Sequence, residues 1–221
     1  MDADFETYLV TQENLSAGRT TRTIAEAAIA GGVDAVQVRE KHRSARERLA
    51  LARDLRDVTA AADVALLVND RVDVALAAGA DGVHLGDDDL PVAAARKQLG
   101  EDAIIGRSVS TPEAAREAEA AGADYLGVGA VYRTGSKEDV PEEEQAIGLE
   151  TVREIDAAVD IPFVGIGGIT PENADEVAAA GADGVAVITA ITQADDPEAA
   201  TQRLGDAVAA GKRRRRQEGQ A

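Results

Sequence analysis

Residues 180–188 read AGADGVAVI, and close variants of this stretch occur at three earlier places in the chain. In each copy, alanine and glycine precede an aspartate, and a short apolar run follows. Each copy is typical of a helix that ends at a glycine turn before a short buried strand begins. Repeated alternation of helices with buried strands predicts a parallel sheet. We refer to the four copies as the cassettes; the other three are AGGVDAVQV at 30–38, AGADGVHLG at 78–86 and AGADYLGVG at 121–129.

Before, between and after the cassettes, the hydrophobic pattern predicts eight strands that alternate with eight helices. This order matches a single (β/α)8 TIM barrel in the α/β class, with an open doubly wound sheet as the alternative. The cassettes supply the second, fourth, sixth and eighth strands. We expect the strands at 8–11, 35–39, 65–69, 82–85, 103–107, 125–128, 162–166 and 184–188. We expect the helices at 20–30, 44–62, 72–78, 91–99, from Thr111-Pro112 onward, at 149–159, from Thr170-Pro171 to 181, and at 197–210.

Composition limits the class of protein. The chain has 221 residues, of which 45% are hydrophobic, so it can bury a substantial core. It has no cysteine, which excludes disulfides, zinc–thiolate sites and cysteine nucleophiles. It has no apolar run near the roughly 18 residues of a membrane span and no basic leader at its start. We therefore expect a cytoplasmic protein without a membrane partner, and a homo-oligomer is compatible with the sequence.

The charge balance is strongly acidic. The formal net charge is −18, and the chain has only four lysines. So acidic a surface makes nucleic acid an unfavourable partner. Its self-repulsion would be relieved by concentrated salt, so we expect a salt-rich cytoplasm.

The C-terminal residues GKRRRRQEGQA have a different composition from the rest. We expect residues 1–210 to form a barrel catalytic domain and residues 211–221 to be a basic, disordered tail.

Polar side chains follow several of the predicted strands, where a barrel of this type places its active site. Gln37, Arg39 and Lys41 alternate at the end of the second strand and would face one side. Two cations and an amide that converge suit a polyphosphate, whereas the alternative is a charged surface turn. Asp70 and Asp89 follow the third and fourth strands. They could share a Mg²⁺ ion, or they could belong to ordinary loops of an acidic protein.

The later strand ends carry hydroxyl groups and glycines. Ser108 follows the fifth strand, and a long loop at 130–147 includes hydroxyls and a lysine, which suit an anion. The glycines of 166–170 and the end of the eighth strand at 188–189 suit a phosphate, or else a tight turn that needs small residues. Of the two histidines, we expect His84 to be packed or hydrogen-bonded rather than catalytic, and His42 to lie in a loop.

Taken in order, these motifs resemble thiamine-phosphate synthase over about residues 8–205. The segments that carry the resemblance are QVREK at 37–41, VNDR at 68–71, DGVHLGDDD at 81–89, GRS at 106–108, ADYLGVGAVYRTGSK at 123–137, VGIGGITPENA at 164–174 and GADGVAVITAI at 181–191. The resemblance implies a transferase of thiamine biosynthesis (EC 2.5.1.3). It would join a pyrimidine diphosphate to a thiazole phosphate, or its carboxylated form, and release pyrophosphate with the help of one Mg²⁺ per site.

The resemblance also implies a role for each matching residue. Asp70 and Asp89 would bind the metal. Arg39, Lys41, Ser108 and Lys137 would be catalytic. The pyrimidine diphosphate would be held by Gln37, Arg39, Lys41, Asn69, Ser108 and Lys137. The thiazole phosphate would be held by Thr134, Ser136, Gly168, Ile188 and Thr189.

Some positions depart from the family pattern. Asp87 stands where glutamine is usual and could add a third carboxylate to the metal site. Ser110, Ala130 and Thr189 replace a histidine, a proline and a serine.

The missing histidine argues against the related thiazole tautomerase. A sugar or tryptophan-pathway isomerase would need a general acid and base rather than the metal pair, and a non-catalytic binding barrel would not require Lys137 and that pair together.

Overall fold

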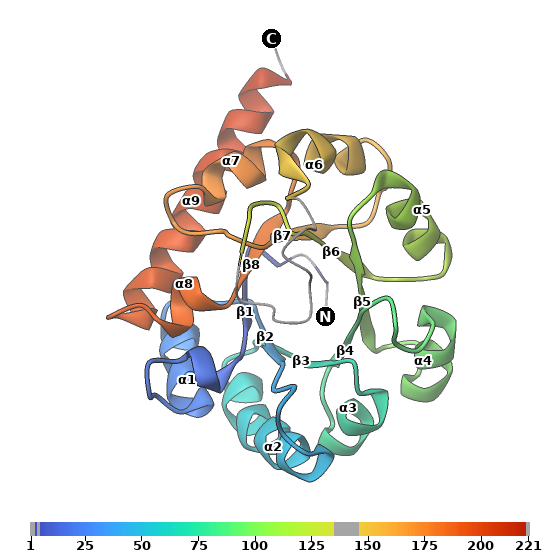
Figure 1. Cartoon of the computed structure of the whole chain (residues 1–221), viewed down its shortest axis with the longest axis vertical. Helices are drawn as coiled ribbons and strands as arrows, with labels where there is room; N and C mark the ends of the chain where they lie inside the picture. The colour runs from blue at the N-terminus through green and yellow to red at the C-terminus, as the bar shows by residue number, and fades with distance from the viewer. Residues whose placement is uncertain (1–2, 4, 135–145, 220–221) are drawn as a thin grey trace.

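The fold is a closed barrel of eight parallel strands surrounded by helices (Figure 1). The structure is a computed structural model, and it describes residues 3, 5–134 and 146–219. Each strand pairs in parallel with the next in the chain, and the last pairs with the first. The strands are β1 (Thr7–Val10), β2 (Ala35–Val38), β3 (Ala65–Asn69), β4 (Gly82–Leu85), β5 (Ile104–Val109), β6 (Tyr125–Gly129), β7 (Phe163–Ile166) and β8 (Gly184–Val187).

Helices cover the outside of this barrel. They are α1 (Thr21–Ala30), α2 (Ala45–Ala61), α3 (Val72–Ala78), α4 (Val92–Leu99), α5 (Pro112–Ala120), α6 (Gly148–Asp156), α7 (Ala174–Ala179), α8 (Thr189–Thr192) and α9 (Pro197–Glu218), with a short 3₁₀ helix, η1 (Glu13–Leu15). Polar caps fix several of the helix starts. Ser44 and Glu47 form a capping box at α2, and Thr111 caps α5 with Pro112 at its first position. No helix in the described ranges combines the length and apolar character that crossing a membrane requires.

The predicted TIM barrel is confirmed, and the four cassettes lead into β2, β4, β6 and β8 as expected. One helix start was predicted wrongly. Thr170-Pro171 does not begin α7, because the Asn173 side chain accepts the Thr170 N–H at 2.8 Å and closes a turn before the helix starts at Ala174. The short elements η1 and α8 were not predicted, because three or four residues carry no helical periodicity.

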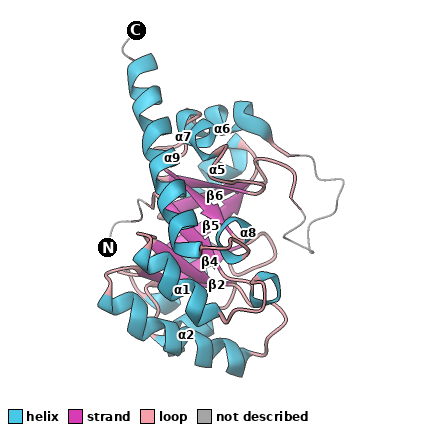
Figure 2. Ribbon diagram, turned by 90° about the vertical axis from the view of Figure 1, so that its left-hand side faces the viewer, coloured by secondary structure: helices cyan, strands magenta, loops and turns pink. Residues whose placement is uncertain are grey.

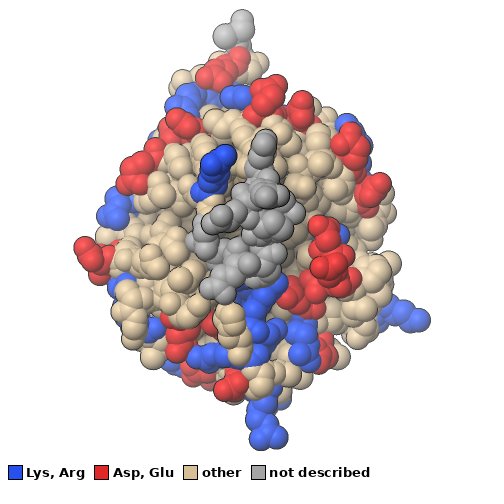
Figure 3. Space-filling model, viewed as in Figure 1, with Lys and Arg blue, Asp and Glu red and all other residues tan. Residues whose placement is uncertain are grey.

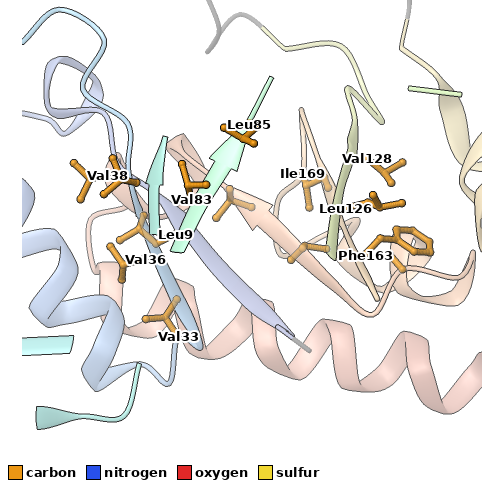
Figure 4. Packing of buried hydrophobic residues seen from close by; sticks show 14 of the residues in the cluster. Leu9, Val33, Val36, Val38, Val83, Leu85, Leu126, Val128, Phe163 and Ile169 are labelled. Carbon is orange, nitrogen blue, oxygen red and sulfur yellow. The ribbon is translucent and has the colours of Figure 1, made fainter. Parts of the chain in front are cut away.

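The core has two layers, which follow from the alternation of side chains along each strand. Outward residues pack against the helices, and Leu9, Val36, Val83 and Leu126 are examples (Figure 4). Inward residues fill the barrel, and this inner layer is smaller and includes the chain's buried tyrosines. The inner layer consists of Phe5, Tyr8, Val10, Ala35, Ala65, Leu67, Ile104, Tyr125, Val164, Ala186 and Ile188.

The aspartate of each cassette joins two neighbouring strands at their N-terminal ends. The Asp34 carboxylate accepts the Thr7 N–H at 2.8 Å, while the Asp34 N–H donates to the Thr7 carbonyl at 2.9 Å. The same two-bond ring recurs between Asp81 and Leu66, Asp124 and Ile105, and Asp183 and Phe163. The cassette therefore satisfies a backbone donor at the start of each odd-numbered strand, at the face of the barrel opposite the strand ends.

The last helix is longer than predicted. We expected residues 211–221 to be a disordered basic tail, but α9 continues to Glu218 and its end projects past the barrel (Figure 2). Three of its basic side chains pair with acids on the N-terminal segment, α7 and α6: Lys212 with Glu6 at 2.9 Å, Arg214 with Asp175 at 3.1 Å, and Arg215 with Asp156 at 2.9 Å. These partners are distant in sequence, which is why composition alone gave the wrong answer.

Candidate active site

A hollow opens at the barrel mouth, where the strands end. Near the barrel axis, Lys and Arg side chains gather beside Asp and Glu side chains (Figure 3). The hollow therefore combines apolar and polar lining side chains with charges of both signs nearby. It is lined by Tyr8, Val10, Gln37, Arg39, Asn69, His84, Gly127, Val164, Ile166 and Ala186.

The end of β2 supplies the amide and the cations. Gln37 and Arg39 line the hollow and are almost fully buried. The Arg39 guanidinium donates to the Gln12 side-chain oxygen at 3.0 Å, and its backbone N–H donates to the Thr11 hydroxyl at 3.1 Å. Lys41 is the third residue of this alternating set, and its Nζ lies 3.8 Å from the Asp70 carboxylate. A buried, oriented guanidinium is suited to bind the oxygens of a phosphate.

The two aspartates predicted to bind metal face each other. Asp70 follows β3, and its carboxyl group lies beside that of Asp89. Partial burial, together with this second carboxylate, raises the pKa of Asp70 to about 6, against the opposing effects of Lys41 and Arg39. The backbone also holds the Asp89 carboxylate in place, because its Oδ2 accepts the Gly86 N–H at 2.6 Å. Two carboxylates held together in this way attract a cation.

This donor set fits magnesium. Mg²⁺ is usually bound through one or two carboxylates, with water and substrate phosphate completing its shell. Asp70 and Asp89 provide that number, and the described ranges hold no group of three or more acidic, histidine or cysteine ligands. The possible third carboxylate, Asp87, is turned elsewhere: it is highly exposed and pairs with Arg107 at 2.6 Å.

Asn69 carries an unsatisfied donor. Its side chain is 7% exposed, lines the hollow and has no partner for Nδ2 among the residues that the structure describes. Buried polar groups are nearly always hydrogen-bonded. The Asn69 amide therefore marks a place where an acceptor group of a bound molecule would lie.

Ser108 lies within β5 rather than after it, because that strand runs to Val109. Its hydroxyl is 2.9 Å from Nε2 of His84, and Nδ1 of His84 is 2.9 Å from the Tyr125 hydroxyl. His84 is thus hydrogen-bonded, as predicted. Sequence reasoning did not single out Tyr8, Tyr125 or Gln12. The signal available for the tyrosines was their scarcity, since the chain has only three.

The ends of β6, β7 and β8 carry the residues predicted from the sequence to bind the thiazole phosphate. Gly168 has a φ of 64°, and a Cβ there would come within 2.7 Å of the Arg133 carbonyl and of Tyr132. The glycine thus lets the segment before Thr134 pack on the end of β7, where the Tyr132 N–H also donates to the Gly167 carbonyl at 3.0 Å. Ile188 and Thr189 begin α8 at the neighbouring strand end. Ser136 and Lys137 lie outside the described residues.

A family model described as thiamine monophosphate synthase matches residues 7–191. The chain belongs to the thiamine-phosphate synthase family. It is 64% identical over 209 residues to the thiamine-phosphate synthase of Haloarcula marismortui, covering 95% of this chain and 99% of the relative. It is 63% identical to that of Natronomonas pharaonis, covering 94% and 97%.

A solved thiamine phosphate pyrophosphorylase from Pyrococcus furiosus superimposes with a TM-score of 0.85 at 40% identity, and 94% of this chain and 97% of that one are covered. The fold and function expected from the motifs are therefore confirmed: the chain is a transferase of thiamine biosynthesis with thiamine-phosphate synthase activity. Both relatives are named as thiamine-phosphate synthases, which favours the synthase over the tautomerase alternative.

Proposed function

We propose that the mouth binds the pyrimidine diphosphate with its diphosphate group between the acidic pair and the cations of β2. The observation that carries this proposal is that the carboxyl groups of Asp70 and Asp89 lie side by side, next to Arg39 and Lys41. In this arrangement, Asp70 and Asp89 would hold Mg²⁺. Arg39, Lys41 and Lys137 bind diphosphate oxygens, and Gln37, Asn69 and Ser108 contact the substrate.

The reaction transfers the pyrimidine-methyl group from diphosphate to the thiazole nitrogen. The carbon–oxygen bond to the diphosphate breaks, the electron pair leaves with pyrophosphate, and the ring nitrogen of the thiazole supplies the pair for the new carbon–nitrogen bond. The bound metal would neutralise charge that grows on the leaving group. Arg39 and Lys41 act on the same charge, and Arg39 is already oriented by Gln12 before substrate arrives.

The phosphate of the thiazole substrate would bind at the side of the mouth formed by the ends of β6, β7 and β8. We assign this role to Thr134, Ser136, Gly168, Ile188 and Thr189. The glycine-rich end of β7 supports the assignment, because it lets the segment that leads to Thr134 pack closely on this strand end. The thiazole would then lie between its own phosphate and the reacting carbon of the pyrimidine.

Asp89→Asn tests the acidic pair. Asparagine keeps an oxygen that can accept the Gly86 N–H, so the local turn is retained while one negative charge is lost. We expect kcat/KM at fixed Mg²⁺ to fall by roughly a hundredfold, because stabilisation of the leaving group is weakened. We also expect more Mg²⁺ to be needed for half-maximal turnover.

Asp88→Asn is the matched control. Asp88 is the exposed neighbour of Asp89, and its substitution removes the same charge from the same loop. Its kinetics should stay close to those of the unsubstituted enzyme. Equal losses in the two variants, or unchanged activity in Asp89→Asn, would refute the assignment of the metal site.

A further inference from the structure

A chain of four hydrogen bonds crosses the interior of the barrel from β2 to β5. Gln37 Nε2 donates to the Tyr8 hydroxyl at 2.7 Å, and that hydroxyl lies 2.9 Å from the hydroxyl of Tyr125. The Tyr125 hydroxyl is 2.9 Å from Nδ1 of His84, whose Nε2 is 2.9 Å from the Ser108 hydroxyl. We call these five side chains the Gln37–Ser108 array.

Two glycines make room for the array. A Cβ at Gly106 would lie 2.1 Å from Tyr125 Cζ and 2.4 Å from its hydroxyl oxygen. A Cβ at Gly127 would lie 2.8 Å from Cε1 of His84. Any side chain at either position would displace the phenol or the imidazole. The strands are therefore shaped to hold the Tyr125 and His84 rings in this geometry.

The direction of the hydrogen bonds follows from the Tyr8 hydroxyl. Burial raises the pKa of both Tyr8 and Tyr125, so each hydroxyl keeps its one proton. Tyr8 accepts from Gln37, and within the described part of the chain Tyr125 is its other hydrogen-bond partner. Tyr8 must therefore donate to Tyr125, because a buried hydroxyl proton without an acceptor is costly.

The hydrogen bonds from Tyr125 to His84 and from His84 to Ser108 run in the same direction. Tyr125 accepts from Tyr8, so its own proton is donated to Nδ1 of His84. A neutral imidazole that accepts at Nδ1 carries its proton on Nε2. Nε2 then donates to the Ser108 oxygen, and the hydroxyl proton of Ser108 is left for a different acceptor.

We propose that His84 is a positioning residue: the Gln37–Ser108 array fixes it as the Nε2–H tautomer, so that the Ser108 hydroxyl donates into the mouth. The proposal rests on the proposed contact between Ser108 and the pyrimidine diphosphate. It adds that this contact is a hydrogen bond donated by Ser108 to an acceptor atom of the substrate. A serine that instead donated to His84 could only accept from the substrate.

The tautomer can be read without substrate by long-range ¹H–¹⁵N NMR of the imidazole rings. The chain has two histidines, so His42→Gln assigns the spectrum. At pH 8, above the usual histidine pKa of about 6.5, we expect a protonated Nε2 and an unprotonated Nδ1 for His84. A proton on Nδ1, or a mixture of tautomers, would overturn the proposal. Neither result depends on whether the enzyme turns over, so this test is separate from that of the proposed function.

The effect on Ser108 is tested with a double-mutant cycle. Tyr125→Phe keeps the ring and removes the donor to His84, and we expect kcat to fall by about tenfold. In a Ser108→Ala background, the same substitution should cause no further loss, because the array would act only through Ser108. Additive losses would show that Tyr125 acts independently and would overturn the proposal.

Tyr132→Phe is the matched control for the NMR measurement. Its hydroxyl donates to Glu176 at 3.1 Å, outside the array. The His84 tautomer should be unchanged in this variant. A changed His84 tautomer in Tyr132→Phe would mean that the tautomer responds to any loss of a phenol, which contradicts the proposed path.

Discussion

Asp70 combines a left-handed backbone, partial burial and a second carboxylate as its neighbour. Its φ is 64°, its N–H donates to the His84 carbonyl at 2.9 Å, and its carboxyl group meets Asp89. Aspartate tolerates this backbone conformation better than most residues, and such conformations concentrate at functional sites. The turn sends the chain from the end of β3 into α3 while leaving the carboxyl group beside the barrel mouth.

The raised pKa of Asp70 predicts a pH-dependent metal affinity. Below its pKa of about 6, Asp70 is protonated, and Mg²⁺ must displace that proton in order to bind. We therefore expect the Mg²⁺ concentration for half-maximal turnover to rise by about tenfold for each pH unit below 6 and to level off above it. Mg²⁺ titrations of the initial rate between pH 5 and pH 8 measure this. A requirement that does not change across that range would contradict the assignment of Asp70.

At the residue scale, the sequence predicted the polar and charged residues at the end of β2 but not the hydrogen-bonded tyrosines inside the barrel. Gln37, Arg39 and Lys41 could be predicted because alternation along one strand places them on one side. The pairing of Tyr8 with Tyr125 could not, because it joins residues 117 positions apart across the barrel interior. The orientation of Arg39 by Gln12 was missed for a similar reason, since Gln12 follows a different strand.

At the scale of elements, the cassettes act at both ends of their strands. Their aspartates close hydrogen-bonded rings with Thr7, Leu66, Ile105 and Phe163 at the N-terminal face. The strands that follow lead to Gln37, His84 and the loops of the mouth. Sequence could assign the cassette to the scaffold, because its turn precedes each strand, but the identity of the paired backbone groups required the structure.

Asp183→Ala tests the structural role of the cassette aspartate. The Phe163 N–H would lose its acceptor, and we expect the free energy of unfolding to fall by about 1–3 kcal/mol. Asp183→Asn keeps an acceptor oxygen and should lose less. Denaturant unfolding measures both values, with the exposed Asp195→Ala as a control that should change by no more than about 0.5 kcal/mol. Similar losses in Asp183→Ala and the control would count against the ring.

Most helices could be predicted from their caps and periodicity, and the exceptions have physical causes. The Asn173 side chain delays the start of α7 by closing a turn at Thr170. The end of α9 is held by acids on other elements, and the buried Gly211 allows it to approach α7: a Cβ there would lie 2.2 Å from the Asp175 carbonyl. Local sequence contains neither set of contacts.

At the scale of the whole molecule, the acidic excess predicts a protein adapted to salt. The formal net charge is −18, and the two relatives named above come from halophilic species. Raising the salt concentration from 0.1 M to 1 M shortens the Debye length from about 10 Å to about 3 Å and weakens repulsion between surface carboxylates.

We therefore expect the melting temperature to rise by several degrees between about 0.1 M and 2 M KCl, measured by calorimetry. A variant with Asp57→Lys, Glu101→Lys and Glu117→Lys reverses charge at three exposed positions. Its melting temperature should depend less on KCl. The same melting temperature at low and high KCl would show that the charge is not a salt adaptation.

Turnover of the two proposed substrates tests the assignment of the mouth most directly. The purified protein is incubated with the pyrimidine diphosphate, the thiazole phosphate and Mg²⁺, and both products are quantified. We predict thiamine phosphate and pyrophosphate in equal amounts, and neither product when a chelator removes the metal. Pyrophosphate without thiamine phosphate, or equal turnover in the presence of the chelator, would contradict the proposed joining of the two substrates at a metal-bound diphosphate.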